Sequence, residues 1–261
     1  MGERRTDGRE GPQQLLGPDD VSPFVVVNPS GGSSFLLLGD HAGRAVPASL
    51  AGLGLGPEAM ERHIAWDIGI AGLGERLASA LDACFIRQTY SRLVIDCNRQ
   101  PGAADAAPAV SDGTAIPGNV GLSEADMAVR RDEIYAPYQD RIAAELDARA
   151  AASRPTLLVS LHSFTPEMGG FARPWRFGVL HRNDSAFSRA MLAVLRETLG
   201  EEVVGDNQPY AMDGTDNTIP LHADARGLDY LEIEVRQDLI AEAAGQDEVA
   251  ALLARLLPLA A

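Results

Sequence analysis

Two histidines of this sequence stand close behind short apolar runs, where a side chain can reach a ligand. His162 follows Leu157–Leu161, and His41 follows Phe35–Leu38 with glycines close by. Such runs predict buried strands of a parallel sheet, and ligands of open α/β sheets bind beyond the carboxyl ends of the strands. A histidine there can ligate a metal or act as a general base, although a single buried histidine more often only completes the core or caps a helix.

Carboxylates complete this candidate site. Asp67 lies in a predicted helix over residues 58–83, and Glu232 and Glu234 share one face of the last predicted strand, because strand side chains repeat every two residues. Two imidazoles and one carboxylate are a usual ligand set for catalytic zinc, and a further carboxylate can accept a proton from water. Asp67 could equally be a plain N-cap, so the residues alone favour a metal site and a structural role about equally.

The segment 91–99 reads as a third strand with unusually many charges around its apolar centre. Arg92, Asp96, Asn98 and Arg99 all fall within it, and a buried strand rarely tolerates so much polarity. An internal Arg–Asp pair that braces the strand is one interpretation. The other is an anion site, because the planar guanidinium of Arg99 beside Asn98 matches a substrate carboxylate.

Strands that alternate with helices predict an α/β fold, with a mostly parallel central sheet and helices on both faces. Residues 1–20 are expected to form a flexible leader and residues 21–261 a single domain. Pro137 should kink or divide a helix that runs from about 123 to 152. The long loop 102–121 suggests a lid or a substrate contact. Further strands are expected near 24–27, 84–86, 177–180 and 228–236, and further helices near 185–199 and 247–257.

The composition limits the possible partners. The 261 residues carry a formal net charge of −15, which argues against nucleic acid and anionic membrane surfaces. Two cysteines are too few for a disulfide framework. No apolar run reaches the ~18 residues of a membrane span, and the first residues lack the apolar core of a signal peptide. The sequence therefore predicts a cytoplasmic protein without nucleic-acid or membrane partners.

A series of blocks over roughly residues 35 to 240 resembles the N-formylglutamate amidohydrolase family, and the blocks occur in the right order. They are Asp40–Ala42, His63–Gly69, Ser91–Arg99, Ile116–Asn119, Leu161–Pro166, Gly205–Tyr210 and Ile233–Leu239. The resemblance implies the three-layer phosphorylase/hydrolase-like α/β fold that zinc carboxypeptidases and N-acetylmuramoyl-alanine amidases share.

The same resemblance implies a ligand set. His41, Asp67 and His162 correspond to the ligands of a single zinc ion. Carboxypeptidases place a glutamate ligand three residues after the first histidine, but Arg44 stands there in this chain. The third ligand must therefore come from elsewhere, with Asp67 preferred and Asp40 in reserve.

The resemblance also implies that Glu234 corresponds to the general base, and that Asn98 and Arg99 correspond to a pair that holds a substrate carboxylate. In the expected mechanism Arg92 or Arg236, as a nearby cation, would stabilise the oxyanion. Asn119 is a further expected substrate-binding residue. The blocks look most like the predicted-amidohydrolase branch of this family, and a departure from it is Gln139, where that branch would have histidine.

Together these patterns predict a zinc-dependent amidohydrolase that cleaves a small N-acyl amino acid, such as N-formylglutamate. The zinc ion would lower the pKa of a bound water toward ~7, and Glu234 would take the proton. The partner is expected to be a small carboxylate substrate. Alternatives are a zinc carboxypeptidase, a cell-wall amidase, or a non-catalytic relative that binds a metal or ligand.

Overall fold

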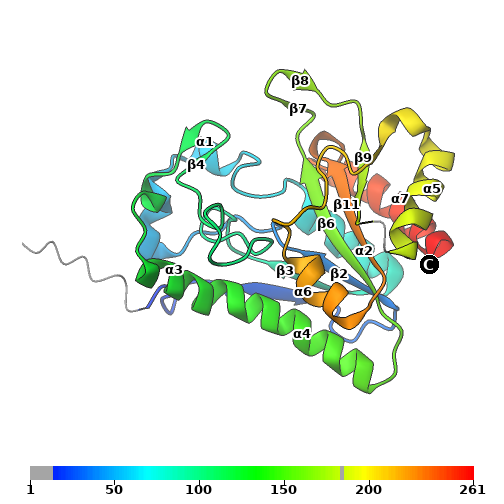
Figure 1. The fold of residues 1–261 in the computed structure, drawn as a ribbon, viewed down its shortest axis with the longest axis horizontal. Coiled ribbons are helices and arrows are strands. Elements are labelled where there is room, and N and C mark those ends of the chain that lie inside the picture. Colours follow the sequence, from blue (N-terminus) through cyan, green and yellow to red (C-terminus); the bar gives the residue numbers. More distant parts are fainter. Residues whose placement is uncertain (1–13, 183–184) are drawn as a thin grey trace, which may run out of the picture.

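A seven-stranded sheet forms the centre of the computed structural model, which describes residues 14–182 and 185–261 (Figure 1). The strand order is β1-β3-β2-β6-β11-β9-β10. The strands are β1 (Phe24–Val27), β2 (Phe35–Gly39), β3 (Cys84–Gln88), β6 (Leu157–Phe164), β9 (Phe177–Leu180), β10 (Val204–Asp206) and β11 (Tyr230–Arg236).

Strand direction explains how this sheet builds a site. The neighbours β3, β2, β6 and β11 are parallel, so their carboxyl ends meet at one edge. At one border β1 runs antiparallel to β3. At the other border β9 runs antiparallel to β11, and β10 runs parallel to β9. The register places Glu234 beside His162 and Glu232 beside Ser160.

Helices cover both faces of the sheet, which confirms the predicted three-layer α/β fold (Figure 1). Along β2, Leu37 faces one core and Leu36 and Leu38 face the other, because side chains alternate across a strand. The first core contains α2 (Ile70–Leu81), α5 (Ala186–Leu199) and α7 (Ala243–Ala260), and the second contains α4 (Ala136–Ala151) and α6 (Thr218–His222).

Shorter elements surround the edge where the strands end. They are the helices α1 (Pro57–Met60) and α3 (Glu124–Arg130), and the hairpins β4–β5 (Val110–Ser111, Thr114–Ala115) and β7–β8 (Glu167–Met168, Phe171–Ala172). Single 3-10 turns lie at Pro117–Asn119, Glu201–Val203, Asp224–Arg226 and Gln237–Leu239, and Ala48–Gly54 forms a 3-10 segment with a kink at Ala51–Leu53. A third apolar cluster, with Leu53 and Ile116 among its members, holds several of these segments together.

The strand predicted over 91–99 is wrong, because this segment forms successive turns. The hydroxyl of Ser91 accepts a hydrogen bond from the N–H of Leu93, and the carboxylate of Asp96 accepts one from the N–H of Asn98. Side chains that bond the nearby backbone compete with a sheet ladder. The apolar centre of the segment is buried against the third apolar cluster instead of in the sheet.

The helix predicted over 58–83 is divided by turns, and α2 begins only at Ile70. Its N-cap is Gly69 rather than Asp67. Gly69 has φ 87°, and a Cβ there would lie 2.2 Å from the carbonyl oxygen of Ile240, so only glycine fits. The carboxylate of Asp67 therefore does not cap α2.

Pro137 divides the helix, as the sequence predicted. The π-helical turn Arg131–Tyr135 links α3 to α4 and ends just before Pro137, which stands in the first turn of α4. A proline has no N–H for the regular bond to the preceding turn, and a π-helical turn is a common place for a helix to change direction.

The expected leader lies only partly within the described residues, since residues 1–13 fall outside them. Leu15 is buried, and the N–H groups of Leu15 and Leu16 donate hydrogen bonds to the carboxylate of Glu133. The segment after residue 13 is thus attached to the fold, which differs from the expected loose segment up to residue 20. Among the described helices, none combines the length and the apolar character that a bilayer crossing requires.

Candidate metal centre

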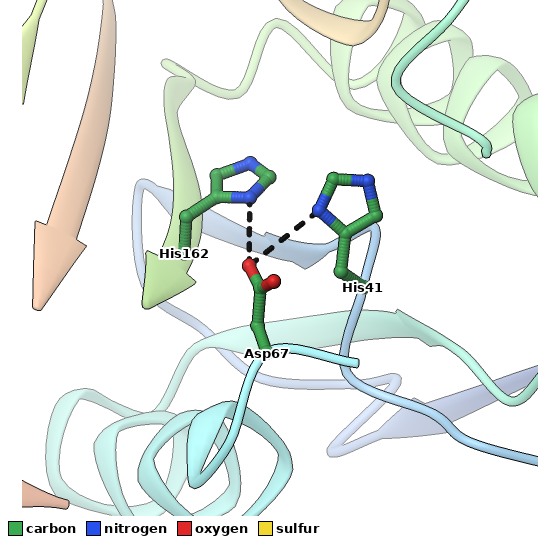
Figure 2. A group of neighbouring side chains, drawn as sticks. All are labelled: His41, Asp67 and His162. Carbon is green, nitrogen blue, oxygen red and sulfur yellow. Dashed lines mark hydrogen bonds and ion pairs between the residues drawn. The ribbon is translucent and has the colours of Figure 1, made fainter. Parts of the chain in front are cut away.

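Three buried side chains converge beyond the ends of β2 and β6. His41 follows β2, His162 lies near the end of β6, and Asp67 lies in the turn before α2 (Figure 2). The N–H of Asp67 donates to the carbonyl of His41 over 2.8 Å, which fixes that turn against β2. Asp67 Oδ2 lies 3.1 Å from His162 Nδ1 and 3.5 Å from His41 Nδ1.

The outer nitrogen of each imidazole is fixed by an acceptor. His41 Nε2 lies 2.7 Å from Asp96 Oδ1. His162 Nε2 lies 3.0 Å from Ser160 Oγ and 3.6 Å from Asp40 Oδ2. Acceptors at both Nε2 atoms favour a proton there, so each Nδ1, which faces Asp67, can lose its proton when a metal ion binds between them. We call His41, Asp67 and His162, with Asp96 and Asp40 behind them, the metal corner.

The donor set fits a divalent metal. One ligand atom from each of His41, Asp67 and His162 lies within 4.8 Å of the others. His41 Nδ1 is buried and has no hydrogen-bond partner among the described residues, which is what a metal ligand requires. Asp40 stands on the far side of His162, at Nε2, so the arrangement favours Asp67 over Asp40 as the third ligand.

Opposite charges shift the pKa values of this corner. Burial raises the pKa of Asp67, but the imidazoles of His41 and His162 outweigh it and hold that pKa far below its usual range. Burial lowers the pKa of His162, but Asp40 and Asp67 outweigh it and raise that pKa well above its usual value. Protons and a metal therefore compete for the same nitrogens, so metal affinity must fall in acid.

Two glutamates of β11 line the same cavity. Glu232 and Glu234 are only 3% and 5% exposed, and one oxygen of each, Oε2, has no hydrogen-bond partner among the described residues. Burial raises the pKa of Glu232 to about 8 and that of Glu234 to about 7. With Asp216, which lines the cavity nearby, we call them the acidic wall.

The cavity between these groups has a volume of about 560 Å³, a usual size for a small-molecule site. Arg92 lines it beside the metal corner. Its Nη2 donates to Asp96 over 2.8 Å, and its Nη1 lies 3.4 Å from Asp67 Oδ1. The internal Arg–Asp pair predicted from the sequence is thus present, and it couples Arg92 to the corner.

Asn98 and Arg99, predicted to bind a substrate carboxylate, also line the cavity, but they hold protein groups. Asn98 Oδ1 accepts hydrogen bonds from the N–H groups of Asn217 and Thr218. Arg99 Nε donates to Asp105 over 2.9 Å, and its Nη1 lies 3.6 Å from Asp216. Both residues join the turns after β3 to the loop before α6.

Two other predicted residues do not reach the cavity. The amide of Asn119 donates to the carbonyls of Leu93 and Pro108, so it holds loops together. Arg236 pairs with Asp238 in the turn that follows β11. Neither residue lines the cavity, so the structure supports neither an oxyanion contact for Arg236 nor a substrate contact for Asn119.

Gln139, which stands where the resemblance led us to expect histidine, has a structural role. It donates to the carbonyl of Cys97, and its Oε1 lies 2.6 Å from Nε2 of His222. Burial lowers the pKa of His222 to about 4, so this histidine is neutral.

The sequence did not identify Tyr210, which lines the cavity. The segment just before it passes over β9. A Cβ at Gly178 of β9 would lie 2.1 Å from the carbonyl oxygen of Gln208 and 3.3 Å from the Cβ of Glu234. Gly178 thus lets the chain pass close to the acidic wall on its way to Tyr210. Arg173 donates to the Tyr210 hydroxyl over 3.1 Å and stacks on its ring, 4.9 Å from the centroid. A glycine inside an apolar strand was the signal available in the sequence.

Comparison with known proteins covers nearly the whole chain. The family model for N-formylglutamate amidohydrolase matches residues 33–241. The gene product Atu2144 from Agrobacterium tumefaciens is 35% identical, with a TM-score of 0.90 over 95% of this chain and 98% of that one. N-formylglutamate amidohydrolase from Ralstonia eutropha JMP134 is 20% identical, with a TM-score of 0.63 over 92% of this chain and 96% of that one, a likeness of fold. No curated protein matches the chain.

Proposed function

Because this chain belongs to the N-formylglutamate amidohydrolase family and is thus a hydrolase of amide bonds, we propose that it acts with one zinc ion on a small N-acyl amine. Membership confirms the resemblance seen in the sequence blocks. The observation that carries the proposal is the convergence of two Nδ1 atoms on one carboxylate, with both Nε2 atoms held from behind.

His41, Asp67 and His162 would hold the metal. Two imidazoles and a carboxylate are the set used by catalytic zinc, which keeps one position open. When bound, the metal supplies Lewis-acid activation of water and of the amide carbonyl. Asp96 and Asp40 keep the imidazoles in the tautomer that presents Nδ1.

Glu234 is the proposed general base and acid. It lies beside His162 on the adjacent strand, and neighbouring strands are about 4.8 Å apart. Its raised pKa, about 7, suits a group that accepts a proton from the attacking water and returns it to the leaving nitrogen. Arg92, which lines the cavity beside the corner, adds positive charge near the developing oxyanion.

Metal analysis and amine release test the proposal together. Purified protein should contain about one zinc per chain. A chelator should abolish amine release from an N-acyl amine panel, and zinc, but not magnesium, should restore it. Protein that is fully loaded with zinc and releases no amine from any member would instead be a non-catalytic relative. Removal of C-terminal residues from peptides would identify a carboxypeptidase.

A further inference from the structure

A buried arginine lies directly behind one part of the cavity wall. Arg173, which follows the β7–β8 hairpin, is only 8% exposed. Its Nη1 donates to the carbonyl oxygen and the hydroxyl of Thr165 over 3.3 Å and 3.1 Å, and to the hydroxyl of Tyr210 over 3.1 Å. Its Nη2 donates to Met168 Sδ, and its guanidinium lies 5.7 Å from the ring centroid of Phe164. All four of these partners line the cavity, so a single layer of side chains separates this charge from a ligand.

Arg173 has no carboxylate partner among the described residues, and its acceptors are neutral. Met168 Sδ, the partner of Nη2, is only a weak acceptor. Other arginines at the cavity are paired with carboxylates, namely Arg62 with Asp112, Arg92 with Asp67 and Asp96, and Arg99 with Asp105 and Asp216. A buried cation is costly unless an anion pairs with it. A negatively charged ligand in the cavity would reduce this cost for Arg173.

Tyr210 connects this charge to the cavity. The residue lines the cavity and is 39% exposed. Its hydroxyl accepts a hydrogen bond from Arg173, and no described residue accepts the hydroxyl's own proton. Burial, and after it the charge of Glu234, raises the pKa of Tyr210, so the hydroxyl is protonated near neutral pH. It can therefore donate to a ligand, and the bond from the guanidinium makes it a stronger donor.

We infer that Tyr210 and Arg173 bind a carboxylate of the substrate. The Tyr210 hydroxyl is the donor that touches this carboxylate, and Arg173 acts through the hydroxyl as a positioning residue that also supplies positive charge. The inference rests on the proposed amide hydrolysis and assigns the residues that select its substrate. It keeps the carboxylate substrate expected from the sequence but does not use Arg99, whose guanidinium already contacts Asp105 and Asp216.

Four related substrates test this selection. The zinc-loaded enzyme is assayed with N-formyl-glutamate, with N-formyl-glutamine, whose side chain is uncharged, with N-formyl-isoglutamine, whose α-carboxylate is a carboxamide, and with the diamide. We expect kcat/KM to fall by roughly tenfold or more when the recognised carboxylate is replaced, because hydrogen bonds to a charged group are the strong ones. The analogue that loses activity identifies which of the two carboxylates Tyr210 contacts.

Variants assign the selection to these two residues. Tyr210→Phe removes only the hydroxyl and should lower the ratio of kcat/KM for the acid over the amide by roughly tenfold. Arg173→Gln removes the charge and should lower this ratio at least as much, whereas Arg173→Lys keeps the charge and should retain more of it. A residue that only braced the fold would not change the ratio in this way. The matched control is Tyr90→Phe, which removes a hydroxyl that donates to the carbonyl of Val21 outside the cavity, and it should keep the wild-type ratio.

Calorimetry gives a readout that needs no turnover. The probes are glutamate, glutamine and isoglutamine, which are amines that these substrates would release. The wild-type protein should bind glutamate more tightly than the amide of the recognised carboxylate, and Tyr210→Phe should remove most of that difference. The Tm of each variant, measured on the same samples, identifies any variant that has not folded.

The outcomes separate the carboxylate site from the proposed function. An equal loss of kcat/KM for acids and amides in Tyr210→Phe would place its hydroxyl at the reacting carbonyl and overturn the inference, with amide hydrolysis still standing. A wild-type ratio in Tyr210→Phe would overturn it as well. No hydrolysis of any substrate, together with glutamate binding that depends on Tyr210, would overturn the proposed function but not the carboxylate site.

Discussion

At the metal corner the outer nitrogen of each imidazole has an acceptor, whereas each glutamate of the acidic wall keeps one oxygen without a hydrogen-bond partner. The difference follows from what surrounds these side chains, since His162 stands on a regular strand as both glutamates do. Side chains of Asp96, Ser160 and Asp40 reach the imidazoles, whereas the two glutamates line the cavity. Fixed partners suit groups that must hold an ion, and free oxygens suit groups that must exchange protons or meet a substrate.

The largest expected effect is at the corner itself. His162→Ala should reduce bound zinc from about one per chain to nearly none and abolish turnover, because three protein ligands are the norm for catalytic zinc. Metal content after gel filtration measures this. His63→Ala, which changes a cavity histidine outside the ligand cluster, is the matched control and should keep its metal. Full zinc occupancy in His162→Ala would disprove the ligand assignment.

The next effect separates the two glutamates of the acidic wall. Glu234→Gln should retain zinc and lose roughly two to four orders of magnitude in kcat, the usual scale for a general acid–base group. Glu232→Gln should reduce kcat for the uncharged glutamine substrate much less. Both variants are compared at equal zinc occupancy. If Glu232→Gln is inactive and Glu234→Gln is active, the proton transfer belongs to Glu232.

The pH dependence of the free energy of unfolding separates His222 from the histidines of the metal corner. The folded pKa of His222 is about 4, below the ~6.5 of an unfolded chain, so the unfolded state alone gains a proton between these values. The contribution of His222 to the free energy of unfolding should therefore fall by roughly 3 kcal/mol as pH drops from 6.5 to 4. Urea unfolding of metal-free protein should show that the wild type loses about this much stability relative to His222→Gln over the same pH range.

The groups of the metal corner and the acidic wall, whose pKa values are also shifted, do not lower the free energy of unfolding between pH 6.5 and 4. Contributions from the raised pKa values of His41 and His162 are complete below pH 6.5, and that from the lowered pKa of Asp67 is lost only below about 4. The raised pKa values of Glu232 and Glu234 act with the opposite sign, since they favour folding at lower pH. They are common to both proteins, so equal slopes for wild type and His222→Gln would contradict the assignment.

A smaller effect is expected behind the ligands. Asp96→Asn removes the charge that holds His41 Nε2, and such changes typically weaken metal binding by 10- to 100-fold. Competition with a fluorescent chelator measures the zinc Kd. Asp105→Asn changes another cavity carboxylate that contacts Arg99 rather than an imidazole, and its Kd should match the wild type.

The smallest effect concerns Arg99. Lysine keeps the charge but cannot hold Asp105 and Asp216 at once, so Arg99→Lys should lower Tm by roughly 2 °C. The ratio of kcat/KM for N-formyl-glutamate over N-formyl-glutamine should change by less than about twofold. A selective loss of the glutamate substrate would show that Arg99 anchors a carboxylate after all.

Local pattern predicted the strands that matter and the two histidines at their ends. His41 and His162 were accessible to sequence reasoning because a buried strand and the residue after it are neighbours in the chain. Asp67 needed the family resemblance, because nothing local distinguishes it from a helix cap.

The errors come from contacts between distant segments. The run 93–95 is as apolar as a strand because it is buried, but it is buried under loops rather than in the sheet. Asn119 and Arg236 lie in the right blocks of sequence, yet their side chains turn toward Leu93 and Asp238. The direction of a side chain at a strand end or in a loop depends on the whole fold, which spacing does not specify.

Gly178 sets a limit on redesign of this enzyme. Any side chain there would meet the carbonyl of Gln208 and contact Glu234, so it would shift the segment that leads to Tyr210 and the proposed proton-transferring group together. A library intended to change substrate range can therefore randomise Tyr210 and Asp216, whose side chains line the cavity, while position 178 stays glycine. Substitutions that change the cavity lining can leave the position of Glu234 unchanged only while residue 178 is glycine.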